Sequence, residues 1–272
     1  MNNRYYLAFL ERLLPRFKKS ERTVSIIIQG PLNARSIKTI DSYLTYGEVI
    51  VSCWNTDDIS ALDEYKDKIK IVINRYEEVE GGGRFSPGSQ APWAYQNYTT
   101  LNGLLQANGY FSIKVRSDES YPDLQPLVDK LVKIHHEQKN PKTGGYDWHK
   151  IITSNIYFRR DRENKHHPSD HIVAGWTSRM IDVYEKALKL SSFGSAGKRF
   201  PEQLLCKAVV ESRFTKGKGR QTLKDEESIS QMKEHFDIIR ISELPNHTWT
   251  SSYRKYDALV SEEDWCHDIN DV

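Results

Sequence analysis

The stretch Thr23–Gly47 reads TVSIIIQGPLNARSIKTIDSYLTYG and joins a strand pattern to a helix pattern. Its first seven residues are mostly β-branched and apolar, as in a strand buried on both faces, and a Gly-Pro pair stops that run. Apolar residues then recur at helical spacing, at Ile37, Ile40 and Leu44, and Gly47 holds the position that glycine favours after a helix. The stretch therefore predicts one β-strand followed by one α-helix.

The same alternation continues along the chain. Further strands are expected at Glu48–Trp54, Ile69–Ile73, Tyr110–Asp118, Ile151–Phe158 and Ile238–Ile241. Further helices are expected at Ala94–Leu105, Ser178–Leu190 and Glu202–Glu211, the last with Pro201 at or near its first position. Because strands that alternate with helices form parallel sheets covered by helices, the sequence predicts an α/β fold with a mostly parallel, Rossmann-type sheet.

Length, charge and cysteine usage restrict the class of protein. The 272 residues predict one main domain over residues 21–250, preceded by a helix over 1–20 and followed by an acidic tail over 251–272. A formal net charge of +2 and a pI of 8.3 are too mild for a nucleic-acid partner. The three cysteines are far apart and odd in number, which favours a reducing compartment over a disulfide framework. No apolar stretch approaches the ~20 residues that span a bilayer, so a cytoplasmic location is expected.

The N-terminal segment is amphipathic and basic over residues 4–19. Its apolar residues Leu7, Leu10, Leu13, Leu14 and Phe17 alternate with Arg4, Arg12, Arg16, Lys18 and Lys19. Helices of this type lie on anionic membrane surfaces, so residues 1–19 predict a peripheral membrane contact. The alternative is a helix that packs on its own domain.

Polar residues that follow the strands are the candidates for a binding site. In open α/β sheets, ligands bind beyond the carboxyl ends of the strands. There an indole can stack on a base, amides can bind base or ribose edges, and arginine can neutralise phosphate. The candidates for nucleotide-sugar binding are Gln29, Gly30, Pro31, Trp54, Asn74, Arg75, Arg116 and Asp118. Any one of them can equally be a turn or cap residue, so the prediction rests on their convergence.

Arg116 and Asp118 are the most informative pair. They end the run YFSIKVRSDE at Tyr110–Glu119 and, being two residues apart, share one face of a strand. A cation and a carboxylate at one strand end suit an enzyme that handles a metal-bound diphosphate.

Five segments, taken in order, resemble the successive motifs of the WavE-type lipopolysaccharide-synthesis proteins. They are VSIIIQGPLN at Val24–Asn33, EVIVSCW at Glu48–Trp54, KVRSD at Lys114–Asp118, HPSD at His167–Asp170 and PEQ at Pro201–Gln203. That family is regarded as glycosyltransferases of the GT-A architecture. The resemblance implies transfer of a sugar from a nucleotide-sugar donor to a surface polysaccharide or a lipid-linked glycan, with a glycan or glycolipid as acceptor.

The resemblance also implies a place for a divalent cation. Arg116-Ser117-Asp118 stands where GT-A enzymes have their DXD motif, but Arg116 replaces the first carboxylate. Asp118 is then the expected ligand of Mn²⁺ or Mg²⁺, with the late His247 as a second metal candidate. Alternatively, Arg116 supplies part of the positive charge and dependence on metal is weak.

Two carboxylates compete as the catalytic base. Glu202, after Pro201 at a helix start, resembles the base of inverting GT-A enzymes, although the helix dipole alone favours glutamate there. Asp170 is the rival, and the histidines beside it, His167 among them, suit contacts with donor or acceptor. A zinc site in this histidine-rich loop is the less favoured alternative, because Pro168 disrupts helical ligand spacing. Glu202 favours an inverting enzyme, and a retaining mechanism stays open.

Two other functions compete with sugar transfer. A sugar nucleotidyltransferase needs a glycine-rich basic loop directly after the first strand, which Gln29–Asn33 does not supply. The other is a non-catalytic nucleotide- or glycan-binding subunit whose DXD motif has changed to Arg-Ser-Asp. The glycines at 81–83 match neither a dinucleotide fingerprint nor a P-loop, and no Gly-x-Ser-x-Gly elbow of a serine hydrolase is present.

Overall fold

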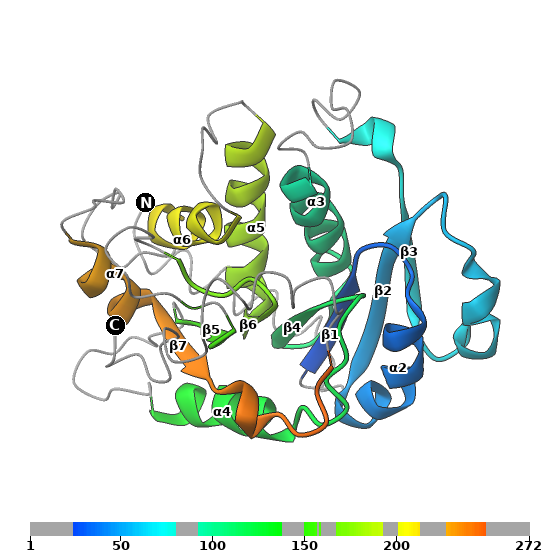
Figure 1. Cartoon of the computed structure of the whole chain (residues 1–272), viewed down its shortest axis with the longest axis horizontal. Coiled ribbons are helices and arrows are strands. Elements are labelled where there is room, and N and C mark those ends of the chain that lie inside the picture. Colours follow the sequence, from blue (N-terminus) through cyan, green and yellow to red (C-terminus); the bar gives the residue numbers. More distant parts are fainter. Residues whose placement is uncertain are drawn as a thin grey trace, which may run out of the picture.

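The protein is built around one mixed sheet. The computed structural model describes residues 24–79, 92–137, 150–156, 158, 167–192, 201–212 and 227–248. The strands are β1 (Val24–Gln29), β2 (Glu48–Trp54), β3 (Lys70–Asn74), β4 (Phe111–Arg116), β5 (Ile151–Ser154), β6 (Ile172–Trp176) and β7 (Phe236–Ile239). Their spatial order is β3-β2-β1-β4-β6-β5-β7 (Figure 1). Only β6 is antiparallel to its neighbours, so the predicted α/β fold with a mostly parallel sheet is confirmed.

Helices cover both faces of the sheet (Figure 1). α2 (Ala34–Tyr46) and α4 (Gln125–Glu137) lie on one face, and α3 (Pro92–Leu104) and α5 (Thr177–Ser192) on the other. α6 (Pro201–Glu211) packs on α5, and α7 (Ser228–His235) precedes β7. Among the described residues, short 3₁₀ helices span Ile59–Tyr65, Tyr76–Glu78 and Ile241–Glu243.

The two faces of β1 enter two separate hydrophobic clusters. Ile26 and Ile28 pack in the cluster that includes residues of α2 and α4. Ile27 belongs to the cluster formed with α3, α5 and α6. This is the pattern that a continuous β-branched run predicts, because successive side chains point to opposite faces and both must be buried.

α2 shows why a helix begins and ends where it does. The side chain of Asn33 accepts a hydrogen bond from the backbone N–H of Arg35 at 3.0 Å, which satisfies one free donor of the first turn. Gly47 follows the last helical residue, as predicted, but its φ of 170° is extended backbone that any residue adopts. Glycine is needed there for space, since a Cβ atom would overlap the carbonyl oxygen of Val24.

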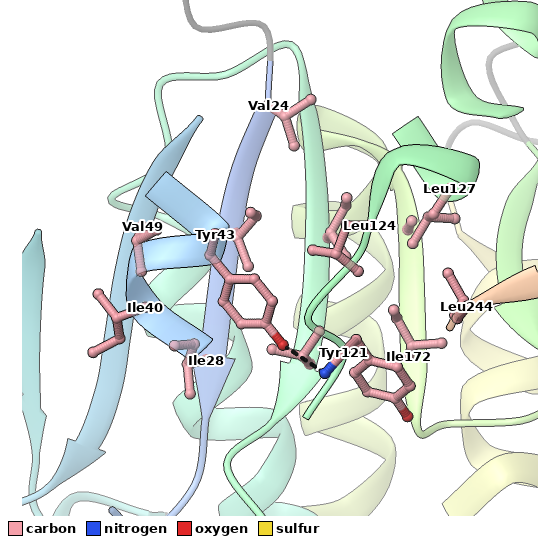
Figure 2. Packing of buried hydrophobic residues seen from close by; sticks show 14 of the residues in the cluster. Val24, Ile28, Ile40, Tyr43, Val49, Tyr121, Leu124, Leu127, Ile172 and Leu244 are labelled. Atoms are coloured by element: carbon pink, nitrogen blue, oxygen red, sulfur yellow. Dashed lines mark hydrogen bonds between the residues drawn. The ribbon is translucent and has the colours of Figure 1, made fainter. Parts of the chain in front are cut away.

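Figure 2 shows the packing under β4. Tyr43 of α2 points across the cluster toward Tyr121, in the loop after β4, and its hydroxyl accepts a hydrogen bond from the backbone N–H of Tyr121 at 3.2 Å. Leu124, Leu127 and Leu244 belong to the same cluster and lie on the same side of Tyr43 as Tyr121. The loop that follows the Arg-Ser-Asp motif is therefore fixed to the core.

Several predicted boundaries need correction. The strand predicted at Ile151–Phe158 is shorter, because only Ile151–Ser154 is β5. The last strand lies at Phe236–Ile239, two residues earlier than predicted. β6, α4 and α7 were not predicted. The proposed helix over 1–20, the tail over 251–272 and the glycines at 81–83 lie outside the described residues.

Candidate active site

The parallel strands bring the predicted residues to one edge of the sheet. Gln29 of β1 and Arg116 of β4 are register partners, as are Trp54 of β2 and Asn74 of β3. β6 enters from the opposite direction and pairs its first residue, Ile172, with Val115 of β4. The HPSD segment, His167–Asp170, lies in the loop before β6. This loop therefore meets the carboxyl end of β4 at the same edge.

Arg116 and Asp118 form a two-pronged ion pair. Nε and Nη2 of Arg116 donate to Oδ1 and Oδ2 of Asp118, each at 3.0 Å. The side chains are 21% and 28% exposed, so the pair is within reach of a ligand. Burial alone would raise the pKa of Asp118, but the hydrogen bonds and charge of Arg116, followed by the charge of His171, lower it below its usual value. Both groups are charged at neutral pH.

Glu119 supports this pair from inside the protein. Its fully buried carboxylate lies 3.3 Å from Nε of Arg116 and 2.5 Å from Nδ1 of His171, and it accepts a hydrogen bond from the hydroxyl of Tyr121 at 2.6 Å. Burial opposes both charges, but Glu119 raises the pKa of His171 and His171 lowers the pKa of Glu119. The guanidinium of Arg116 is thus held between two carboxylates.

A second buried pair joins β4 to the loop before β6. Nζ of Lys114 donates to the backbone oxygen of Asp170 at 2.5 Å, and the amide of Gln96, on α3, donates to Oδ2 of Asp170 at 2.7 Å. Burial lowers the pKa of Lys114 to about 8. Burial alone would raise the pKa of Asp170, but Lys114, His171 and Arg116 hold it far below its usual value. Asp170 is consequently a stable anion that resists protonation.

Glu202 lies near the other end of the same loop. It is in the first turn of α6, as predicted, and its Oε2 is 3.5 Å from Nε2 of His167. The Glu202 side chain is 14% exposed, whereas His167 is buried. The loop His167–Asp170 therefore connects the two predicted bases. Glu202 contacts its first residue, His167, and Asp170 is its last residue.

Trp54 and Asn74 are packed inside the protein. The indole of Trp54 is 2% exposed and stacks on the ring of Tyr76, with ring centroids 4.0 Å apart. The amide of Asn74 donates to Ser52 and the backbone of Cys53, and its oxygen accepts from Asn102. In this conformation both side chains shape the edge of the sheet, and their contact with a nucleotide stays a prediction.

The remaining candidates, Gln29, Gly30, Pro31 and Arg75, lie at or just after the carboxyl ends of β1 and β3. Gly30 has a φ of +114°, and a Cβ there would lie 2.9 Å from Oγ of Ser117, so glycine is required by both conformation and space. Pro31 and Arg75 are exposed. The side chain of Gln29 is buried, and its Oε1 has no hydrogen-bond partner among the described residues. These placements agree with a binding site at this edge of the sheet.

The residues of this region do not match a carboxylate-rich metal site. Both oxygens of Asp118 already accept hydrogen bonds from Arg116. Nδ1 of His247 lies 2.9 Å from the backbone oxygen of Leu244, although the neighbouring Thr248 pairs with Ser120 and so brings this segment next to the motif. Across the part of the chain that the structure describes, no three His, Cys, Asp or Glu side chains are grouped so that they could hold an ion.

Comparison with known proteins identifies the family. A model of WavE lipopolysaccharide synthesis proteins matches residues 24–237, most of the chain. The chain belongs to this family. The five segments all lie within the matched residues, and two of them, KVRSD and HPSD, supply the cluster around Arg116 and Asp170.

The comparisons with solved structures and with curated proteins give no residue roles. The fold is similar to that of the apo form of glycosyltransferase GlyE from Streptococcus pneumoniae TIGR4, with a TM-score of 0.40 and 10% sequence identity. The match covers 75% of this chain but only 46% of the GlyE structure, so the chain spans less than half of that protein. This likeness is too distant to transfer the role of any residue. No curated protein matches the sequence.

The sequence patterns assigned no role to Lys114 or Gln96, and they predicted a substrate contact for the histidines beside Asp170 but not the pairing of His171 with Glu119. Lys114 lies inside the quoted motif, and a lysine between Ile113 and Val115 in a buried strand is a usable signal for a buried charge that needs a partner. The contacts of Gln96 with Asp170 and of His171 with Glu119 join residues 74 and 52 positions apart, and no local pattern encodes them.

Proposed function

We propose that the chain transfers a sugar from a nucleotide-sugar donor to a glycan acceptor during lipopolysaccharide or related surface-polysaccharide synthesis. Membership of the WavE family supports the pathway. The chemistry is supported by the charged cluster at the carboxyl edge of the sheet, which is where α/β proteins bind nucleotides. One observation carries the proposal: the guanidinium at the end of β4 interacts with Asp170, which ends a short loop whose first residue, His167, contacts the partly exposed carboxylate of Glu202.

In this proposal Arg116 acts on the donor. A hydroxyl oxygen of the acceptor attacks the anomeric carbon, and the bond from that carbon to the diphosphate oxygen breaks with its electron pair on the diphosphate. Arg116 binds the developing negative charge, because a guanidinium is permanently charged and forms paired hydrogen bonds with phosphate oxygens. Asp118 and Glu119 fix its orientation, so little reorganisation is needed during the reaction.

Glu202 takes the proton from the acceptor hydroxyl. Asp170 is poorly suited to this step, since its pKa is held far below its usual value and a strong acid is a weak base. Glu202 is partly exposed and lies 3.5 Å from Nε2 of His167. Asp170 instead orients the edge of the cluster through Lys114 and Gln96. This assignment favours inversion at the anomeric carbon.

The test is release of nucleoside diphosphate from a panel of nucleotide sugars. The purified chain should release it from one donor class, faster when bacterial surface glycan is added. Asp118→Ala should abolish the release while the variant stays folded, because Arg116 loses its positioning partner. Asp63→Ala, at an exposed position in the 3₁₀ helix Ile59–Tyr65, is the matched control and should behave as the wild type.

Two outcomes would contradict the proposal. Nucleotide binding without release from any donor would favour the non-catalytic binding subunit. Pyrophosphate release from a nucleoside triphosphate and a sugar phosphate would instead identify a sugar nucleotidyltransferase.

A further inference from the structure

Arg116 stands where a metal-dependent enzyme of this architecture would have its first carboxylate. The structure shows what this change does locally. Arg116 is fixed within the site, because its guanidinium donates hydrogen bonds to both carboxylate oxygens of Asp118 and also contacts the buried Glu119. A divalent cation at Asp118 would have to displace a charged partner that the same chain provides.

The charge balance of the cluster also argues against a bound divalent cation. The three cationic groups Lys114, Arg116 and His171 interact with the three acidic groups Asp118, Glu119 and Asp170. With His171 protonated, the six formal charges cancel. Sites for hard divalent cations gather an excess of carboxylate oxygen, which this cluster does not have.

We propose that Arg116 replaces a protein-bound divalent cation as the group that neutralises the leaving nucleoside diphosphate, so that donor binding and transfer need no added metal. Asp118 is then a positioning residue for the guanidinium and not a metal ligand. The inference rests on the proposed function, because it assigns the charge partner of the donor in that same site. It differs from the GT-A pattern, in which a cation bridges the motif and the diphosphate.

The test measures nucleotide binding and not turnover. The thermal midpoint of the wild-type chain is recorded with a series of nucleoside diphosphates, once in EDTA and once in MnCl₂, because a ligand that binds only the folded state raises this midpoint. The dissociation constant in EDTA should lie within about threefold of the value in MnCl₂. Binding that appears only with Mn²⁺ would overturn this inference while leaving the proposed function intact. No binding in either buffer would overturn both.

Variants of Arg116 identify the group responsible. Arg116→Ala should weaken binding in EDTA by about 10- to 100-fold, because it removes a charged partner with paired hydrogen bonds. Arg116→Lys should lose less, since it keeps the charge but not the planar fork. Lys66→Ala, at an exposed position outside the cluster, is the control and should not change binding. Equal affinities of Arg116→Ala and the wild type in EDTA would overturn the inference.

Arg116→Asp provides the sharpest comparison, because it restores two carboxylates in the motif. Its binding should be weak in EDTA and should recover with MnCl₂, and electron paramagnetic resonance should show Mn²⁺ bound by this variant but not by the wild type. Thermal midpoints without ligand establish that each variant is folded. If the wild type and Arg116→Asp bind Mn²⁺ with the same affinity, the proposal is contradicted.

Discussion

Arg116 determines the charge of the candidate site. A motif with two carboxylates was the family expectation, and here Arg116 and Asp118 form an ion pair within the motif. Its guanidinium is fixed by Asp118 at the surface and by Glu119 in the interior. Glu119 is itself fixed by His171 and Tyr121. A cation held in this way loses little freedom when an anion binds, which is the condition for efficient electrostatic stabilisation.

The assignment of the base is tested by two amide variants. Glu202→Gln should lower turnover by about 100-fold or more with donor affinity unchanged, because an amide keeps the shape of the side chain but cannot take a proton. Asp170→Asn should mainly raise the apparent Michaelis constant, since Asp170 orients the cluster through Lys114 and Gln96. Steady-state kinetics of both variants distinguishes the roles.

Each pattern of results has a clear meaning. Loss of turnover in Asp170→Asn but not in Glu202→Gln reverses the assignment. Full activity in both variants indicates a retaining reaction that needs no enzymatic base toward the acceptor.

The buried pair of His171 and Glu119 predicts a pH-dependent contribution to stability. The pKa of His171 is raised in the folded state, so the pair stabilises the protein fully below the unfolded value of about 6.5 and loses this effect as pH rises through the folded pKa. His171→Gln should therefore cost about 2–3 kcal/mol at pH 6 and clearly less at pH 9. Urea unfolding of both proteins at the two pH values measures the difference, and a cost that does not change with pH would contradict the account.

At the scale of elements, β6 determines the architecture of the site. It runs antiparallel to β4, so the loop before it, and not the loop after it, lies at the carboxyl edge of the parallel strands. This brings Asp170 next to Lys114 and His171 next to Glu119. A parallel strand at this place would have carried these residues to the opposite edge of the sheet.

The sequence predicted the regular elements well where their patterns were long. β2 has the bounds that its apolar run predicts, and α6 begins at Pro201 as expected. β6 was missed because Ile172–Trp176 is five residues long, contains a glycine and has no period of its own. The direction of this strand and the buried pairs that depend on it are set by tertiary packing, which single-sequence patterns do not encode.

The turn between β1 and α2 gives a prediction about strain. Gly30→Ala should destabilise the fold by about 1–3 kcal/mol and weaken nucleotide binding, because its φ of +114° disfavours any side chain and the new Cβ would press on Ser117. Thermal unfolding measures the loss. The double variant with Ser117→Ala should recover only the part due to contact. A single variant as stable as the wild type would show that the turn relaxes freely.

For the whole molecule, we predict that residues 1–19 attach the protein to an anionic membrane surface. Within the described ranges, no helix is both long and apolar enough to cross a bilayer. If residues 1–19 form a surface anchor, deleting them should reduce sedimentation with anionic vesicles and spare activity on a soluble acceptor analogue. Loss of folding after the deletion would favour a helix packed on the domain instead, and neutral vesicles are the control for charge.

In the proposed reaction of the whole protein, a sugar moves from a nucleotide donor to a surface glycan. Mass spectrometry of a deacylated lipopolysaccharide acceptor, incubated with the purified chain and a nucleotide-sugar panel in EDTA, tests it most directly. The account predicts that one donor increases the mass of the acceptor by one glycosyl residue, and that Glu202→Gln prevents this. An acceptor of unchanged mass with every donor, in EDTA and with Mn²⁺ alike and with the folded wild-type chain present, would contradict the claim.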